Sequence, residues 1–334
     1  MRPFMDSTDL LADGPMLAAR MRSDGYLFLR DVLPVPALRA LQGQIGALAR
    51  EAGWLRADRD VADAIADPAG FCVDPDPDYL RTLRRINRLE DYHALKHHAV
   101  LMGLMERLMG RPVFPLPLTL MRNIFPARTE YTTKAHQDYP NVQGTQTCIT
   151  AWIPLVDCPI DVGPLQVAVG SHTMGVLDFD IAGGAGGIEI VDPLEGRWAS
   201  GDFRQGDVLL FHSMTVHKGL PNLSDRLRMS MDVRYQPVDE PFCAVNARPD
   251  GQPLSWEEVY ADWKSDDLKY YWRRLSLVEA PFDRQWFDKR DALGFARGAA
   301  GDPAARSVLQ RIVARDADPE KRARAQALLA TLPA

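Results

Sequence analysis

The segment from about residue 113 to residue 237 constrains the fold most, because it consists of short apolar runs with no helical period between them. Proline, glycine and asparagine separate these runs, as they do at the ends of strands. The expected strands are Leu118–Phe125, Thr147–Leu155, Leu165–Val169, Val208–His212 and Leu227–Tyr235. Several short strands without intervening helices are typical of an antiparallel sandwich or jelly roll. We therefore predict a mainly β core in this part of the chain.

Helices are predicted before this core. In Pro36–Ala52, leucine and isoleucine recur every three or four residues until Gly53, which is typical of an amphipathic helix. A second helical stretch with the same apolar spacing is expected over Asp91–Met109, and it ends at Gly110. The short apolar run Gly25–Leu29 ahead of them is expected to be a strand.

The C-terminal part of the chain is again helical in pattern. Asp302-Pro303 and Asp318-Pro319 each place a capping aspartate before a proline suited to a first helical turn. We predict an α+β protein in which residues 1–297 form one domain around the β core. Residues 298–334 are expected to form a helical extension that packs on the core or on a partner subunit, so a homo-oligomer is compatible with the sequence.

The charge of the chain argues against several kinds of partner. The 334 residues carry 39 lysines and arginines against 45 aspartates and glutamates, a formal net charge of −6. Nucleic acids and anionic membranes need a basic face, which this balance does not favour. No run approaches the roughly 18 apolar residues that span a bilayer, and the N-terminal segment lacks the apolar centre of a secretory signal. We expect a cytoplasmic protein that binds a small molecule.

Seven histidines are present, and their neighbours indicate which of them could bind a metal ion. His93, His97 and His98 lie in a predicted helix with no general base between them, and we interpret them as partly exposed helix residues. His136 differs, because Asp138 follows it two residues later. Residues i and i+2 of an extended segment point to the same side, so this imidazole and this carboxylate can reach one ion.

A third metal ligand must come from another segment, and two more histidines lie on or just after a predicted strand. His212 ends the strand expected over Val208–His212, and His217 follows it closely. Two histidines and one carboxylate on one side of a metal leave its other positions open. This arrangement suits non-haem Fe(II) and oxygen chemistry.

The last predicted strand adds basic and polar groups. Along it, apolar residues alternate with Arg228, Ser230, Asp232 and Arg234. Strand parity puts these polar side chains on one face. Arg228 could pair bidentately with the carboxylate of a cosubstrate, and Ser230 could donate a hydrogen bond to the same group.

Taken in chain order, these segments resemble the phytanoyl-CoA dioxygenase family of Fe(II)- and 2-oxoglutarate-dependent oxygenases. The matching segments are His136-Gln137-Asp138, Ala151–Asp157, Gly163-Pro164-Leu165, Gly170-Ser171-His172, Gly206-Asp207 and His217 through Arg228. Asp24-Gly25-Tyr26 and the helix after it also resemble the family's opening, so the resemblance covers roughly residues 20–237. It implies a double-stranded β-helix, a cupin-like jelly roll, flanked by N- and C-terminal helices.

The resemblance also implies a set of site residues. The implied iron ligands are His136, Asp138 and His217. The implied 2-oxoglutarate residues are Arg228, Ser230 and Trp152, the last as part of the pocket wall. His217 is preferred to His212 because its distance in sequence from Arg228 matches the family's spacing. His172 is interpreted as a structural turn residue.

The residues that would contact the substrate are less constrained by the pattern. Tyr139 directly follows the His136/Asp138 pair, while Arg122 and Asn123 lie on the preceding predicted strand. Asp232 and Arg234 share the polar face of the last strand. Arginines at the mouth of a cavity would suit an acidic or carboxylated metabolite.

Asp138 bears on the reaction, because related halogenases carry a small residue in place of this carboxylate. Its presence favours hydroxylation of a small-molecule metabolite with O2 and 2-oxoglutarate, releasing succinate and CO2. Desaturation, epoxidation or ring closure with the same cofactors is the alternative. Two further alternatives are a jelly-roll binding protein without turnover and a cupin-type isomerase or hydrolase that uses zinc or manganese.

Overall fold

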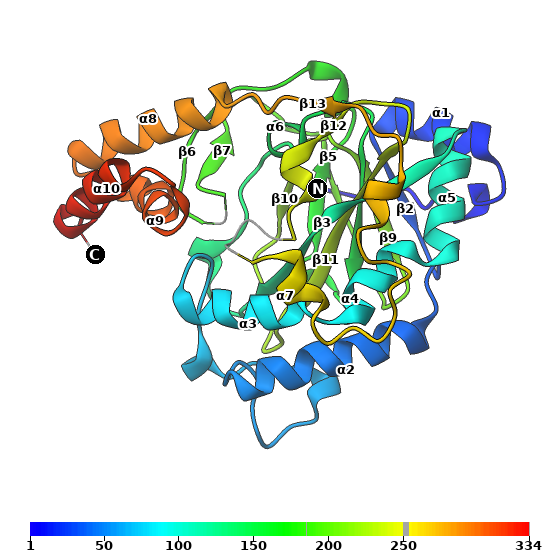
Figure 1. Ribbon diagram of the computed structural model, residues 1–334, viewed down its shortest axis with the longest axis horizontal. Helices are drawn as coiled ribbons and strands as arrows, with labels where there is room; N and C mark the ends of the chain where they lie inside the picture. The colour runs from blue at the N-terminus through cyan, green and yellow to red at the C-terminus, as the bar shows by residue number, and fades with distance from the viewer. Residues whose placement is uncertain (185, 250–253, 334) are drawn as a thin grey trace.

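Two sheets form the centre of the computed structural model, which describes residues 1–184, 186–249 and 254–333 (Figure 1). Within these residues, the larger sheet has five antiparallel strands in the order β2-β9-β4-β11-β3. Their bounds are Tyr26–Leu29 (β2), Val208–His212 (β9), Ile149–Pro154 (β4), Arg228–Pro237 (β11) and Val113–Ile124 (β3). The smaller sheet contains Arg2–Pro3 (β1), Trp198–Ser200 (β8), Leu165–Ala168 (β5) and His217–Gly219 (β10), in that order. The expected strands are thus confirmed: β9 has the expected bounds, and the ends of the others are shifted.

The two sheets pack against each other through aromatic and aliphatic side chains. Phe28, Trp152 and Phe211 of the larger sheet belong to one buried cluster with Leu165 and Val167 of the smaller sheet. The opposite face of the larger sheet is covered by helices. Both faces of its central strands are therefore buried, which explains why β4 is buried along its whole length.

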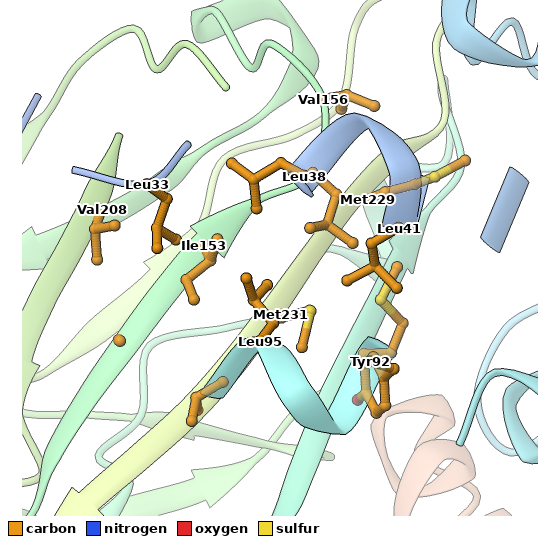
Figure 2. Packing of buried hydrophobic residues seen from close by; sticks show 14 of the residues in the cluster. Leu33, Leu38, Leu41, Tyr92, Leu95, Ile153, Val156, Val208, Met229 and Met231 are labelled. Carbon is orange, nitrogen blue, oxygen red and sulfur yellow. The ribbon is translucent and has the colours of Figure 1, made fainter. Parts of the chain in front are cut away.

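The helices that cover the larger sheet bury their apolar residues against β11. Figure 2 shows Met229 and Met231 of β11 beside Leu38 and Leu41 of helix α2 (Val35–Glu51), all in one cluster. Fully burying such a side chain stabilises the fold by about 1.5–3 kcal/mol. Three other helices of this layer are α1 (Gly14–Asp24), α3 (Pro77–Asn87) and α5 (Ala99–Met109). The sequence pattern did not indicate α1 or α3.

The stretch expected as one helix over Asp91–Met109 is interrupted. Helix α4 (Glu90–Ala94) continues into a short 3-10 turn, and α5 begins only after His98. The His98 side chain accepts a hydrogen bond from the Val100 N–H at 3.3 Å and so caps α5. The expectation of one continuous helix was wrong. The apolar spacing continues across the break, so the sequence pattern does not reveal the interruption.

The pairing of β3 with β11 is irregular between Val233 and Tyr235. The facing part of β3 contains Pro115 and Pro117, which have no N–H to donate to a neighbouring strand. Lys96, only 1% exposed, donates from its Nζ to the carbonyl oxygen of Pro117 at 2.7 Å. The buried lysine thus satisfies a carbonyl group within this irregular stretch.

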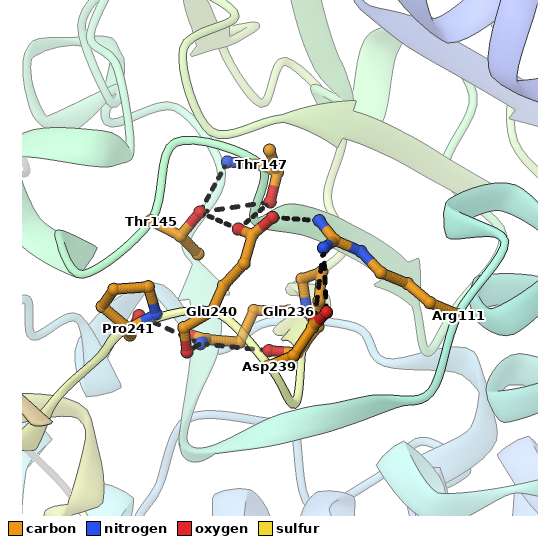
Figure 3. Close-up of polar contacts among 8 residues, drawn as sticks. Arg111, Thr145, Thr147, Gln236, Asp239, Glu240 and Pro241 are labelled. Atoms are coloured by element: carbon orange, nitrogen blue, oxygen red, sulfur yellow. Dashed lines mark hydrogen bonds and ion pairs between the residues drawn. The ribbon is translucent and has the colours of Figure 1, made fainter. Parts of the chain in front are cut away.

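A polar cluster joins the loop after β11 to the segments before β3 and β4 (Figure 3). The Glu240 carboxylate accepts hydrogen bonds from the hydroxyl groups of Thr145 and Thr147 and pairs with Arg111. Arg111 also pairs with Asp239 at 3.2 Å. The loop leads to β12 (Phe242–Cys243), which pairs with β13 (Glu279–Ala280), and to helix α7 (Trp256–Tyr260).

The C-terminal helices form a unit of their own at one side of the molecule (Figure 1). Their bounds are Gln285–Ala299 (α8), Arg306–Arg315 (α9) and Pro319–Thr331 (α10). They share a buried cluster with Ile181 of the hairpin β6 (Phe179–Ile181) and β7 (Ile188–Ile190). Asp302 and Asp318 cap as expected, each accepting a backbone N–H two residues on. The expected boundary between residues 297 and 298 falls inside α8.

Among the helices that the structure describes, none is both long and apolar enough to cross a membrane.

Candidate active site

His136 and His217 meet at the edge of the smaller sheet. The backbone N–H of His136 donates to the His217 carbonyl oxygen at 3.0 Å, and the backbone N–H of His217 donates to the His136 carbonyl oxygen at 3.0 Å. This bridge places the centres of the two imidazole rings 4.2 Å apart. Two residues that are far apart in sequence are therefore fixed side by side by backbone pairing.

Asp138 completes a group of three candidate metal ligands. It directly precedes the short helix α6 (Tyr139–Val142), and its carboxylate turns toward the two histidines. One ligand atom each from His136, Asp138 and His217 lie within 4.8 Å of one another. The structure thus brings together the three residues expected to bind iron.

Backbone carbonyl groups hold the two imidazoles in position. Nδ1 of His136 lies 2.8 Å from the Lys134 carbonyl oxygen, and Nδ1 of His217 lies 3.0 Å from that of Thr215. A proton on each Nδ1 would donate to these oxygens, which leaves both Nε2 atoms as lone-pair donors for a metal. This arrangement fits the donor set of a non-haem iron site.

Burial keeps both imidazoles neutral. It lowers the pKa of His136 to about 3, with a further contribution from nearby His217, and it also lowers the pKa of His217. Because only a neutral imidazole can bind a metal, the two side chains are ready to do so across the physiological pH range.

Asp138 is held by two further side chains. Arg234 of β11 donates from Nη2 to Oδ1 at 2.8 Å and from Nε to Oδ2 at 3.1 Å. The Thr150 hydroxyl group of β4 donates to Oδ2 at 2.6 Å. Burial alone would raise the pKa of Asp138, but the charge of Arg234, its hydrogen bonds to the carboxylate and the two nearby histidines together outweigh burial and hold the pKa below its ordinary value. Strand parity indicated that Arg234 faces the cavity, but not that it contacts Asp138.

The residues expected to hold 2-oxoglutarate lie on the same inner face of the larger sheet. Arg228 is 3% exposed and donates to the Gly163 carbonyl oxygen. Among the described residues, no hydrogen-bond partner faces Arg228 Nε, Ser230 Oγ or Trp152 Nε1, all three buried. Buried donors without a partner are costly. A carboxylate would supply acceptors, so these residues fit the expected cosubstrate.

The substrate candidates are not all brought to one place. Arg122 lines the cavity that His136 and Asp138 also line, and its Nε pairs with Asp232 at 3.1 Å. Asn123 is paired with Met229 and so lies on the helix-covered face of the sheet. Tyr139 lines a neighbouring hollow of about 560 Å³ between α6 and α8.

Two other histidines that the sequence analysis considered, His212 and His172, lie away from the candidate metal ligands. His212 ends β9 with its ring centre 5.5 Å from that of His172, and its Nδ1 accepts the Met214 N–H at 3.1 Å. His172 Nε2 lies 3.0 Å from the Arg22 carbonyl oxygen. Neither residue belongs to the group of three candidate ligands.

A cavity of about 320 Å³ contains His136 and Asp138 in its wall. Its apolar wall includes Leu83, Leu118, Leu120, Ile188, Trp286 and Phe287. The last two belong to α8, so the C-terminal helices reach the cavity. Sequence reasoning missed this part of the site, because the helix pattern of the tail gives no information on what it packs against.

Comparisons with known proteins agree with this geometry. A family model described as phytanoyl-CoA dioxygenase (PhyH) matches residues 21–230. Two curated relatives are named 1-deoxypentalenic acid 11-beta-hydroxylase. The protein from Streptomyces arenae is 30% identical over 259 residues and that from Streptomyces exfoliatus 28% over 253 residues. Each alignment covers 70% of this chain and 85% of the relative.

Among solved structures, the chain is similar to the non-heme monooxygenase ThoJ in its apo form. The TM-score is 0.50 at 21% identity, over 68% of this chain and 79% of that chain. This likeness supports the jelly-roll fold. The family match includes the three candidate ligands, Arg228 and Ser230, and it ends before Arg234 and the C-terminal helices.

Proposed function

The chain belongs to the phytanoyl-CoA dioxygenase family of Fe(II)- and 2-oxoglutarate-dependent oxygenases, and we propose that it hydroxylates a small-molecule metabolite with release of succinate and CO2. The observation that carries this proposal is the buried group His136, Asp138 and His217, whose ligand atoms lie within 4.8 Å of one another. The names of the curated relatives, both hydroxylases, favour hydroxylation among the oxidations open to the class.

In this proposal, the two histidines and Asp138 hold the iron. Bound Fe(II), together with 2-oxoglutarate and O2, supplies an oxidant strong enough for an unactivated C–H bond. Arg228 binds a carboxylate of 2-oxoglutarate, and Ser230 and Trp152 donate hydrogen bonds into the same pocket. Arg228 Nε, Ser230 Oγ and Trp152 Nε1 have no other partner among the described residues, so the cosubstrate would satisfy them.

The remaining residues of the site orient the ligands and exclude water. Arg234 and Thr150 fix the direction of the Asp138 carboxylate. The apolar wall around the cavity keeps bulk water away from the metal, which favours oxidation of the substrate over side reactions. Retention of Asp138 favours hydroxylation over halogenation.

Other oxidations and other enzyme types differ in what they require of these residues. Desaturation, epoxidation or ring closure would use the same groups and is separated from hydroxylation by product mass. A non-oxidative metal-dependent cupin has no need of a buried arginine at residue 228. The cytoplasmic location, the homo-oligomer and the absence of nucleic-acid or membrane partners stay predictions.

The proposal is tested by anaerobic titration of the protein with Fe(II) and 2-oxoglutarate, followed by a metabolite screen under O2. Wild type should show the weak visible charge-transfer band of the iron chelate and then a product heavier by one oxygen. Asp138→Ala should lose iron binding and the band. Asp157→Ala, which removes an exposed carboxylate on the loop after β4, is the matched control and should retain both.

Two results would contradict the proposal. One is the absence of the band in wild type at saturating Fe(II) and 2-oxoglutarate. The other is unchanged iron binding in Asp138→Ala. A product lighter by two hydrogens would show that the enzyme catalyses desaturation or ring closure instead of hydroxylation, within the same enzyme class.

A further inference from the structure

A second hollow lies beside the cavity that contains the candidate metal ligands. It has a volume of about 560 Å³, against about 320 Å³ for that cavity, and it lies between α6 and α8. Tyr139, which directly follows the candidate ligand Asp138, lines this hollow. Strand β6 runs alongside α8 (Figure 1) and contributes Phe179 to its wall. We call this space the outer hollow; the proposed reaction assigns no role to it.

The outer hollow and the cavity meet where α6 contacts α8. On α6, Tyr139 and Pro140 line the hollow. The next two residues of the same helix, Asn141 and Val142, line the cavity instead. On α8, Trp286 lines both spaces. The two spaces are therefore neighbours, and the Trp286 side chain lies between them.

The Gln143 side chain fixes the contact between α6 and α8. Its Oε1 accepts the Asp283 N–H at 2.7 Å, and its Nε2 donates to the Asp283 carbonyl oxygen at 2.8 Å. Nε2 also donates to the Pro140 carbonyl oxygen at 3.0 Å. An amide that is paired at both ends has one orientation, so the segment that leads into α8 is held in place beside α6. The outer hollow is thus formed before a ligand binds, which lowers the ordering cost of binding.

Aromatic and aliphatic side chains line much of the outer hollow. The ring centres of Phe179 and Trp286 lie 4.5 Å apart, and the ring planes are inclined by 39°. Pro140 and Leu177 add apolar surface. Val176, which also lines the hollow, is 51% exposed, so it marks the open side. A flat ring can stack on the aromatic faces and cover this apolar surface.

The charged groups of the outer hollow do not favour an anion. Among the described residues that line it, the only charged side chains are those of Lys289, Asp178 and Asp283, which gives a net negative charge. Lys289 already pairs with Asp178. The Asp283 carboxylate accepts the Gln285 N–H at 2.9 Å. An anionic ligand would meet a negative wall whose one cation is occupied, so an uncharged ligand fits best.

We propose that the outer hollow is the distal part of the substrate site and binds an uncharged, flat ring system of the substrate against Trp286. The reacting part of the same molecule then extends past Trp286 toward the candidate metal ligands. This inference rests on the proposed function for the position of the metal, but binding in the hollow does not require turnover. Helix α8 lies outside residues 21–230, so part of the ring-binding wall lies beyond the family match.

The first test is a fluorescence titration of the metal-free, full-length protein with N-phenyl-1-naphthylamine. This probe is an uncharged ring compound whose emission rises in apolar surroundings. Wild type should bind it at one saturable site. Trp286→Ala should weaken binding by roughly tenfold, because it removes the aromatic face. Trp286→Phe, which keeps a ring, should recover most of this loss.

A second variant changes the wall at an exposed position, so that a loss of binding does not come from a loss of folding. Val176→Glu places a charge on the apolar wall and should weaken binding of the probe several-fold. The matched control is Leu223→Glu, which makes a similar change at a 67% exposed residue after β10. It should bind the probe as wild type does.

Three results of these titrations would overturn the proposal. One is the absence of probe binding in wild type. Another is an equal loss of affinity in Val176→Glu and Leu223→Glu, which would reduce the effect to net charge. The third is unchanged affinity in Trp286→Ala.

The preference for an uncharged ring is tested with 8-anilinonaphthalene-1-sulfonate, which carries the same rings and one negative charge. The part of its binding that depends on Trp286 should be weaker by about tenfold or more, because the sulfonate would be left without a free cation in the hollow. Equal or tighter binding of the sulfonate that is lost in Trp286→Ala would assign the hollow to an anionic ligand and overturn the proposal.

The place of the outer hollow in the substrate site is tested by proton NMR of the bound uncharged probe. Mn(II) bound by the candidate metal ligands should broaden the probe's signals, because paramagnetic relaxation acts only at short range. Zn(II), which is diamagnetic, should not broaden them, and Mn(II) should have no effect in Asp138→Ala. Unbroadened signals in wild type with bound Mn(II) would separate the hollow from the metal site and overturn the proposal. Failure of wild type to bind Mn(II), measured by calorimetry, would contradict the proposed function instead, and the probe titrations would still decide whether the hollow binds a ring.

Discussion

Asp138 shows how a single residue is prepared for its role. Its two oxygens are held by Arg234 and Thr150, so the carboxylate has one orientation before a metal binds. The ion pair with Arg234 is buried, with each side chain about 5% exposed. Removing one partner of such a pair leaves a charge without compensation, which costs far more than an exposed pair contributes.

We expect Arg234→Met to destabilise the metal-free protein by about 3–5 kcal/mol, because the Asp138 carboxylate would remain buried without its cation. Mn(II) should restore part of this loss by supplying a positive charge to the same carboxylate. Urea unfolding with and without Mn(II) measures both effects. The control is Arg39→Met on the exposed face of α2. Equal stability of the two variants in the absence of metal would refute the role of Arg234.

Strand β11 shows how one element joins the core to the site. Met229 and Met231 pack under the helices, while Arg228 and Ser230 face the space between the sheets. A register slip of one residue would bury the charged residues among the helices and expose the methionines to the cavity. The apolar face therefore fixes the position of the binding groups on the other face.

Arg228→Gln should weaken binding of 2-oxoglutarate by roughly 10- to 100-fold, because it removes the charged partner of the cosubstrate carboxylate. Iron affinity should remain near that of wild type, since Arg228 is not among the candidate ligands. Arg226→Gln is the matched control, because that side chain contacts the Asp63 carbonyl oxygen instead. Anaerobic titrations with Fe(II) and then 2-oxoglutarate separate the two affinities. An unchanged affinity for 2-oxoglutarate would show that Arg228 does not bind the cosubstrate.

At the scale of the whole molecule, the charge of the site is opposite to that of the protein. The chain has a net charge of −6, yet five arginines line the cavity. The overall field would therefore attract an acidic ligand only weakly, and local guanidinium groups would have to provide its recognition. The C-terminal helices contribute three of these five arginines.

Acid should destabilise the metal-free protein through its buried histidines. Burial lowers the pKa of His97 and of His136 to about 3, whereas an unfolded histidine titrates near pH 6.5. Below that pH these histidines bind protons in the unfolded chain but stay neutral in the folded chain, so the stability of the protein falls as the pH falls. Each such histidine lowers the free energy of unfolding by about 1.4 kcal/mol per pH unit below about pH 6.

Urea unfolding between pH 4 and 8 measures this dependence. His97→Gln should remove the contribution of one proton from the slope below about pH 6 and leave the slope above pH 7.5 unchanged. The same acid slope in wild type and His97→Gln would contradict the neutral buried state of this residue.

The sequence by itself determined the features that depend on near neighbours. Alternation along the last strand placed Arg228, Ser230 and Arg234 on one face, and the two-residue spacing of His136 and Asp138 put both near one point. The order of these segments sufficed for the fold and the family, and their spacing favoured His217 as the third candidate ligand. These features are local or shared by the family, so they are readable without knowing how distant segments pack.

Only the tertiary structure decided which distant groups meet. Asp138 and Arg234 are 96 residues apart, and Asp74 and Arg311 are 237 residues apart. The same tail pattern is compatible with packing on many surfaces, because an amphipathic helix specifies an apolar face and not its partner. The arginines of α9 reach the cavity only because Val308 and Leu309 of that helix are buried in a cluster with Ile181 of the β6–β7 hairpin. The packing of these apolar side chains therefore decides where the neighbouring arginines of the same helix are placed.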